Sequence, residues 1–343
     1  MHSCRERSGL ACSHKPFAQS AFAAGVRLCL TAVIALAFAS VSVASVPQQE
    51  RDALVAMYAS TNGPGWANAA NWMGAAGSEC SWYGVTCDAA QTHVIEIFLP
   101  GNKLSGSLPS LAPFSSLQTF EASSNQLTGE IPAFGPSTAL QWFDVAENQL
   151  SGTLPDLSGL SNLQTFAVSW NALSGPVPRL DGLAALRDFS ADGNQLSGSL
   201  PPLAGLSNLQ NLSLNQNALS GPIPVLQGLN NLANLFLSGN QLTGSIPELS
   251  GLLALRQFNV SDNRLSGGIP DLTGLPRLKF FSIVGNQVSG TVPPSISTLT
   301  TLQWFLVGRN HLFGQLPPAP ANLLVASLCP NPLPFGLLSQ RPL

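Results

Sequence analysis

Apolar and polar residues follow a pattern along this chain that returns every 23 residues. Around Asn217, apolar residues stand eight, five and three positions before and two after, followed by a Gly four after, an apolar residue six after and a Pro seven after. The same surroundings recur, with one last step of 24 residues, around nine further asparagines: Asn102, Asn125, Asn148, Asn171, Asn194, Asn240, Asn263, Asn286 and Asn310. A repeat of about 20 to 29 residues predicts similar coils stacked on one continuous core.

Each repeat contains the pattern LxxLxL, in which the last two apolar positions alternate with polar ones. This alternation predicts a short strand with one buried face. Glycine and proline interrupt the rest of each repeat and no helical period follows, so we expect turns, short extended segments and 3-10 turns on the return path. The predicted fold is mainly β, a right-handed parallel solenoid of about ten coils of 23–24 residues.

Two aligned side chains in the repeat should hold neighbouring coils together. The asparagine amide both donates and accepts hydrogen bonds, so at the end of a strand it can satisfy backbone groups of the buried turn. Stacked coils should therefore form an asparagine ladder. Five residues before the asparagine, Phe is frequent, and these rings are expected to stack as one spine through the core: Phe120, Phe143, Phe166, Phe189, Phe258, Phe281 and Phe305.

Residues 46–93 do not follow the repeat. Leu54, Val55 and Tyr58 stand at helical spacing, which predicts a short helix over Glu50–Tyr58. The residues that follow it are Trp66, Trp72, Cys80, Trp82, Gly84, Val85 and Cys87. This order resembles the N-terminal capping module of plant-type leucine-rich-repeat proteins, and LxxLxLxxNxLxGxIP resembles their repeat. Similar modules cap receptor-kinase ectodomains, polygalacturonase-inhibiting proteins and secreted bacterial relatives. The resemblance covers residues 50 to about 320 and implies a leucine-rich-repeat solenoid with a cap.

The cap should cover the apolar end of the solenoid. Cys80 and Cys87 enclose a short loop, and in an exported protein we expect them to form a disulfide. A zinc site is the alternative, but no second pair of Cys or His residues lies nearby.

Four segments are predicted: a signal peptide over residues 1–45, the cap over 46–93, the solenoid over 94–317, and a degenerate last coil with a short tail over 318–343. The first segment has a basic region, an apolar run over 28–39 and then small residues, typical of a secretory signal peptide cleaved after Ala44 or Ala39. An uncleaved anchor is the alternative. In the last segment Cys329 could be buried, solvent-facing or bonded to another molecule.

Charge is unevenly distributed along the chain. Beyond residue 45, 10 basic side chains stand against 16 acidic ones, so nucleic acid is not an expected partner. Between Glu79 and Glu248 there are 12 acidic and 3 basic residues, whereas from residue 250 onward there are 2 acidic and 6 basic. This asymmetry either steers a basic ligand to the front half or is ordinary variation on a solvated surface.

Catalysis finds little support in the sequence. His93 and His311 stand at opposite ends of the solenoid, roughly 40 Å apart at about 4.8 Å per strand, so they cannot share one site. Glu121 and Asp144 should be neighbours on adjacent strands, at the separation of about 5 Å used by retaining glycosidases. An open sheet, however, offers no enclosed pocket to raise the pKa of either carboxyl, so we expect a solvated acidic patch.

Binding on the concave face is the better hypothesis. Aromatic side chains there would stand among carboxylates, amides and hydroxyls, which suits a protein surface or a sugar chain, although single exposed aromatics are common on any protein. The candidate binding residues are Phe98, Glu121, Trp142, Asp144, Glu147, Trp170, Asp188, Asp192, Phe236, Phe280 and Trp304.

These observations together predict a secreted, non-catalytic recognition protein that binds an extracellular protein, peptide or polysaccharide. A structural or adhesive cell-surface spacer is the alternative, and the resemblance to polygalacturonase inhibitors also implies an inhibitor of an extracellular glycan-degrading enzyme. No cofactor or metal is expected, and membrane association is expected only if the N-terminal segment stays uncleaved.

Overall fold

The computed structural model describes residues 45–135 and 139–333. The predicted signal peptide, apart from Ser45, lies outside these residues, as does the end of the predicted tail. The chain divides into two units, Met1–Ser42 and Val43–Leu343, and only the second contains described residues.

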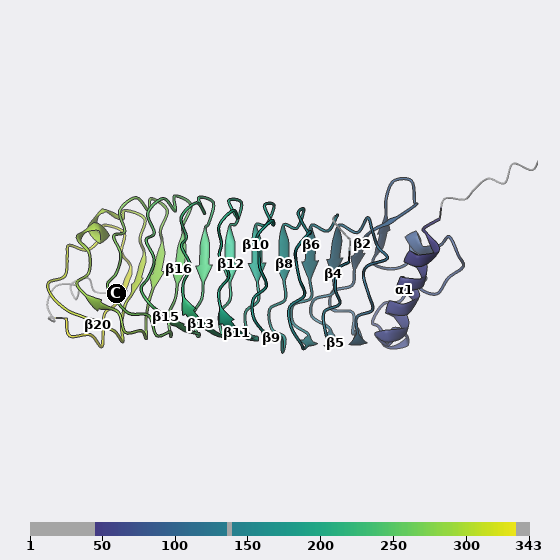
Figure 1. The fold of residues 1–343 in the computed structure, drawn as a ribbon, viewed down its shortest axis with the longest axis horizontal. Helices are drawn as coiled ribbons and strands as arrows, with labels where there is room; N and C mark the ends of the chain where they lie inside the picture. Colours follow the sequence, from purple (N-terminus) through teal and green to yellow (C-terminus); the bar gives the residue numbers. More distant parts are fainter. Residues whose placement is uncertain (1–44, 136–138, 334–343) are drawn as a thin grey trace, which may run out of the picture. The chain divides into compact units, whose positions relative to one another are not determined.

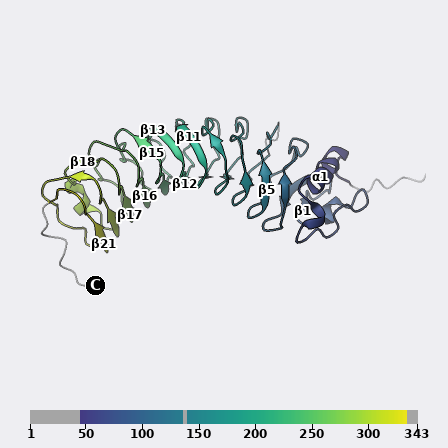
Figure 2. The same cartoon turned by 90° about the horizontal axis from the view of Figure 1, so that it is seen from below.

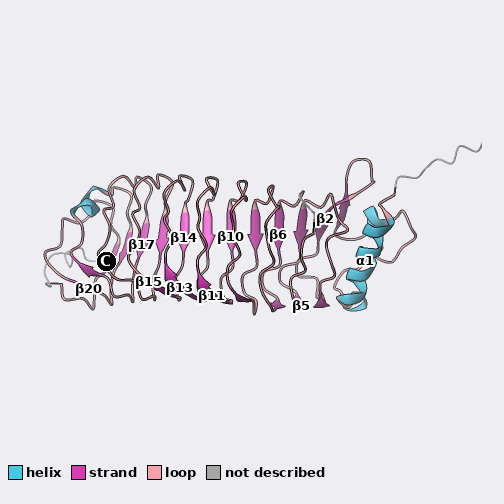
Figure 3. Cartoon of the chain, viewed as in Figure 1, coloured by secondary structure: helices cyan, strands magenta, loops and turns pink. Residues whose placement is uncertain are grey.

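One long sheet runs through the described part of the second unit (Figures 1 and 3). Its 12 strands, in spatial order, are β1 Val85–Cys87, β2 Val94–Phe98, β4 Thr119–Glu121, β6 Trp142–Asp144, β8 Thr165–Ala167, β10 Asp188–Ser190, β12 Asn211–Ser213, β14 Asn234–Phe236, β16 Gln257–Asn259, β17 Phe280–Ser282, β19 Trp304–Leu306 and β21 Val325–Ser327. Strand β1 is antiparallel to β2, and the other neighbours are parallel. Within this unit the coils form an arc with the long sheet on its inner side (Figure 2), so this sheet is the concave face.

The return path of each coil is short and irregular, as the Gly and Pro pattern predicts. Small parallel sheets form there from β3 Ser105–Ser107, β5 Gln126–Gly129, β7 Gln149–Leu150, β9 Ser174–Gly175, β11 Gln195–Ser199, β13 Ala218–Pro222, β15 Gln241–Thr243, β18 Ser289–Gly290 and β20 His311–Leu312. The 24-residue step contains a 3-10 turn, η3 Pro294–Thr298, before β19. Because β17 and β19 still pair residue by residue, the extra residue leaves the register of the long sheet unchanged.

The aromatic core differs from the predicted single spine. Phe120, Phe143, Phe166 and Phe189 form one stack, with 5.5 Å between the centroids of successive rings. A second stack contains Phe258, Phe281 and Phe305, with centroids 5.3 and 5.7 Å apart. The prediction of one continuous spine was wrong because Leu212 and Leu235 occupy the two positions between the stacks.

The asparagine ladder is confirmed. Asn148 is typical: its Oδ1 accepts a hydrogen bond from the Leu127 backbone N–H of the preceding coil at 2.9 Å. Its Nδ2 donates to the Ala122 carbonyl of that coil and to the Val145 carbonyl of its own coil, at 3.0 and 3.1 Å. Each amide therefore joins two consecutive coils and satisfies backbone groups that the turn would otherwise leave unpaired.

A compact cap precedes the first coil. It contains α1 Gln48–Ser60, slightly longer than predicted, and two 3-10 turns, η1 Gly63–Gly65 and η2 Glu79–Ser81. The Cys80–Cys87 disulfide is formed, which confirms the expected pairing. Glu50 of α1 is buried and accepts a hydrogen bond from the Val94 backbone N–H at 2.7 Å, which fastens the helix to β2.

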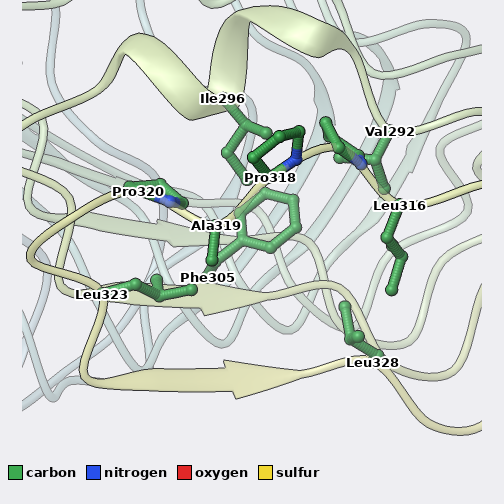
Figure 4. A pocket seen from close by; sticks show the side chains of 10 residues that line it. Val292, Ile296, Phe305, Leu316, Pro318, Ala319, Pro320, Leu323 and Leu328 are labelled. Carbon is green, nitrogen blue, oxygen red and sulfur yellow. The ribbon is translucent and has the colours of Figure 1, made fainter. Parts of the chain in front are cut away.

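At the other end, β21 continues the long sheet beside β19. Asn331 extends the ladder: its Nδ2 donates to the Val307 carbonyl at 2.8 Å, and its Oδ1 accepts from the Leu312 N–H at 3.0 Å. An apolar cavity of about 10 Å³ lies between η3 and this last coil, lined by residues such as Ile296 and Phe305 (Figure 4). Cys329 is exposed and forms no disulfide with another described residue, so the buried alternative is wrong.

Candidate ligand-binding face

The outward side chains of the concave sheet stand in columns, because each strand is in register with its neighbours. Glu121 and Asp144 are directly paired across β4 and β6, as predicted. All the candidate binding residues lie on strands of this sheet or in the turns that follow them. Their role in binding stays a prediction.

Five of these residues gather on consecutive coils, and we call them the acidic aromatic patch: Glu121, Trp142, Asp144, Glu147 and Trp170. The Trp142 ring is 42% exposed, and its Nε1 donates to Glu121 Oε2 at 3.3 Å. Glu121 itself is only 7% exposed, and its Oε1 accepts from the Ser123 backbone N–H at 3.0 Å. A buried carboxylate therefore fixes the edge of an exposed indole ring.

Asp144 lies beside Trp142 on the same outward face of β6, since residues two apart on a strand share a face. Its Oδ1 accepts from the Ala146 backbone N–H at 2.9 Å, and Oδ2 has no donor among the described residues. On the side away from Glu121, Asp144 is paired with Ala167, whose methyl group is too short to reach across it.

Burial raises the pKa of Asp144, the hydrogen bond from the Ala146 N–H lowers it, and the negative charges of Glu121 and Glu147 raise it; together these effects place the pKa at about 6. The expectation that no carboxyl on this open sheet would have a raised pKa is therefore wrong for Asp144. Sequence reasoning missed the effect because it treated the face as fully solvated, whereas the Asp144 side chain is half-buried and its carboxyl has lost part of its water.

The turns after the strands supply the other two members of the patch. Glu147 Oε2 accepts from the Ser124 hydroxyl of the preceding coil at 2.7 Å. Trp170 is 53% exposed, and its ring lies against Gly193, where a Cβ atom would fall 2.4 Å from the ring. Only glycine leaves room for the ring in this position. Ser124 and Gly193 were not predicted, although both stand one residue before a ladder asparagine, in the same column as Glu147 and Trp170.

A second region, the polar strip, follows toward the middle of the sheet and consists of Asp188, Asp192, Asn211, Ser213, Asn215, Asn234 and Ser238. Asp192 accepts from the Ser213 hydroxyl at 2.7 Å and from the Asn215 backbone N–H at 2.6 Å. Asn215 Oδ1 in turn accepts from the Ser238 hydroxyl at 2.7 Å. Asn211 donates to Asp188 and accepts from Asn234. The polar groups of this strip are thus largely satisfied by one another.

The remaining aromatic candidates are spread over other parts of the face. Phe98 is exposed on β2, beside the cap, and Trp304 is exposed on β19. Phe236 and Phe280 are half-buried. Lys279, directly before β17, is exposed.

No Lys, Arg or His side chain among the described residues forms an ion pair with a carboxylate of the acidic aromatic patch. The ion pairs among these residues all lie elsewhere: Arg51–Glu79, His93–Glu50, Arg179–Asp181 and Arg309–Asp262. Within residues 45–135 and 139–333, no group of three or more His, Cys, Asp or Glu side chains is placed to hold a metal ion. The same ranges contain no helix with the length and apolar character needed to cross a membrane.

Comparison with known families and structures agrees with this architecture. A family model described as leucine rich repeat N-terminal domain matches residues 47–88, and one described as leucine rich repeat matches residues 231–253. A search of curated proteins found no match.

Three solved structures illustrate the likeness. The ectodomain of the receptor kinase GASSHO1/SCHENGEN3 from Arabidopsis thaliana, solved in complex with CASPARIAN STRIP INTEGRITY FACTOR 2, is 31% identical with a TM-score of 0.77, over 84% of this chain and 36% of that one. The plant peptide hormone receptor RGFR1, solved in complex with RGF2, is 32% identical with a TM-score of 0.62; the match covers 69% of this chain and 43% of the receptor chain. A plant ice-binding protein is 24% identical with a TM-score of 0.65, and the match covers 84% of this chain and 98% of that protein. This likeness shows the fold alone.

The chain spans less than half the length of the two receptor ectodomains. The family models nevertheless match a leucine-rich-repeat N-terminal domain and, after it, a leucine-rich repeat in this chain. The chain is therefore a leucine-rich-repeat protein, in which a leucine-rich-repeat N-terminal domain precedes a solenoid like those of plant receptor-kinase ectodomains.

Proposed function

We propose that this chain is a non-catalytic extracellular recognition protein that binds a peptide, or an extended segment of a protein, on its concave face. The observation that carries the proposal is the acidic aromatic patch, where exposed Trp142 and Trp170 stand beside carboxylates that have no basic partner among the described residues. Exposed aromatic rings next to polar groups are the usual anchors of protein recognition.

Two further features support the proposal. The Cys80–Cys87 disulfide fits an oxidising, extracellular compartment, and the basic, apolar and small-residue order of residues 1–45 fits export. The receptor ectodomains of similar structure include one described as a peptide hormone receptor. Polysaccharide binding is the competing possibility, and the experiment below separates the two.

The test uses the full chain immobilised as bait, with a phage-displayed library of random 12-residue peptides and a set of soluble pectins and β-glucans as probes. Selected peptides should bind the wild-type chain and lose affinity by about tenfold to thirtyfold in the double variant Trp142→Ala with Asp144→Ala. The matched control is Val225→Ala with Glu248→Ala, because both residues are exposed on the return path.

Peptide binding that both double variants retain equally would show that the concave patch is not the site. Binding of polysaccharides without selection of any peptide would overturn the proposal in favour of a glycan-binding protein.

A further inference from the structure

We infer that the ligand places an arginine side chain on the acidic aromatic patch, with its guanidinium group against Asp144 and over the Trp142 ring. This inference rests on the proposed function and gives it a specific chemistry. It starts from the charge of the patch.

Three carboxyl groups, those of Glu121, Asp144 and Glu147, occupy two adjacent coils. Within the described part of the chain, the donors that reach them are two backbone N–H groups, one hydroxyl and one indole N–H, all of them neutral. Such donors orient carboxylates but do not cancel their charge. A cationic ligand group would do so, and charge complementarity therefore selects a basic partner over an acidic or neutral one.

The three carboxyl groups are not equally available. Glu121 is nearly covered, and both of its oxygens already accept hydrogen bonds. Glu147 is exposed, with one oxygen bonded to Ser124. Asp144 Oδ2 has no donor among the described residues, and the residue paired with Asp144 on β8 is Ala167, which has no polar side-chain group. Asp144 and Glu147 therefore each keep one oxygen that can accept from a ligand, and Asp144 is the one that shares the outward face of β6 with the Trp142 ring.

Trp142 explains the preference for arginine over lysine. Its ring is exposed next to Asp144, and its orientation is fixed by the hydrogen bond to Glu121. A guanidinium group is planar and can stack on an indole ring while its N–H groups donate to a carboxylate at its edge. An ammonium group is a compact, strongly hydrated charge and gains less from a flat ring.

The first test compares one selected peptide with derivatives in which a single arginine is replaced. Citrulline keeps the shape and most N–H groups of arginine but is neutral, so we expect it to weaken binding to the wild-type chain by about tenfold or more. Lysine should weaken binding less, by about threefold. This comparison needs no variant of the protein and is therefore independent of any folding defect.

The second test varies the protein and the pH. The variant Asp144→Asn should bind the arginine peptide and the citrulline peptide with nearly equal affinity. For the wild-type chain, affinity for the arginine peptide should rise by about tenfold between pH 5 and pH 7.5, because the Asp144 carboxyl ionises in that interval and arginine stays charged throughout. Asp144→Asn should remove this pH dependence.

The two proposals fail in different ways. If selected peptides depend on Trp142 but lose nothing when arginine becomes citrulline, the arginine inference is wrong while the peptide-binding proposal stands. If no peptide depends on the patch, both are wrong.

Discussion

The acidic aromatic patch and the polar strip lie on the same sheet and have the same backbone, yet their side chains are used in opposite ways. In the polar strip, Asp192 receives donors from Ser213 and Asn215 of the next coil. In the patch, Asp144 receives one backbone donor, and its other oxygen has no partner among the residues that the structure describes. Groups that are already satisfied contribute to stability, and groups left without partners are available to a ligand. Carboxylates on a repeat sheet should therefore be judged by their partners, not by their position in the repeat.

The largest effect should come from the core beneath the patch. Phe143 is buried between Phe120 and Phe166, directly under the outward face of β6. Phe143→Ala should lower the free energy of unfolding by about 3 to 5 kcal/mol, because it removes a buried ring and leaves a cavity. Urea denaturation measures this value. A loss below about 1 kcal/mol would show that the ring stack is not a rigid support for the patch.

The next effect tests the polar strip. Asp192→Ala should lower the free energy of unfolding by about 1 to 3 kcal/mol, because it leaves the Asn215 N–H and the Ser213 hydroxyl without their acceptor. Affinity for a selected peptide should change less than twofold, which we regard as about the limit of measurement. Asp192→Asn is the control, since its carbonyl oxygen can still accept. A large loss of affinity in a fully folded Asp192→Ala protein would extend the binding site into the strip.

Trp170→Ala should do the reverse of Asp192→Ala: it should lower peptide affinity and leave stability unchanged. Trp170→Ala should leave the free energy of unfolding within about 0.5 kcal/mol of the wild type, since the ring is largely exposed. Peptide affinity should fall by about threefold to tenfold if the ring contacts the ligand. Calorimetric titration beside thermal denaturation of the same sample separates the two quantities. Lost stability with unchanged affinity would place Trp170 with the structural residues.

The Asp144 carboxyl itself should make the stability depend on pH. Its pKa is raised from an ordinary value of 3.8 to about 6 in the folded chain, so the folded state binds this proton more tightly than the unfolded state does. The associated stability is fully present below about pH 4 and is lost as the pH rises through 6. Asp144→Asn should therefore raise the Tm relative to the wild type at pH 7.5 and not at pH 3.5. An equal difference at both pH values would contradict the raised pKa.

The sequence predicted the parts of the structure that depend on regular spacing. The asparagine positions predicted the ladder, and the strand register placed Glu121 beside Asp144. The split of the aromatic stack was also visible in the sequence, since Leu212 and Leu235 occupy the positions between Phe189 and Phe258. The regular repeat predicts one stack, and these two leucines are the exceptions that divide it.

Two properties of the patch could not be predicted from spacing. The pKa of Asp144 depends on how much water neighbouring side chains remove and on the distances to two other carboxyl groups. The position of the Trp170 ring depends on a glycine one coil away, 23 residues later in the chain. Both properties arise between coils, where side-chain direction matters as much as residue type.

The asparagine ladder has a consequence for how a disturbance spreads along the molecule. Among the described residues, each ladder amide from Asn125 onward bonds its own coil and the coil before it, so the coupling is between nearest neighbours, as in a one-dimensional chain of linked units. Fraying that begins at the terminal coils must then open one junction after another before it reaches β6. Amide hydrogen exchange should therefore slow progressively from β21 toward the interior. The coils that carry the acidic aromatic patch should stay folded while the distant end unfolds and refolds locally.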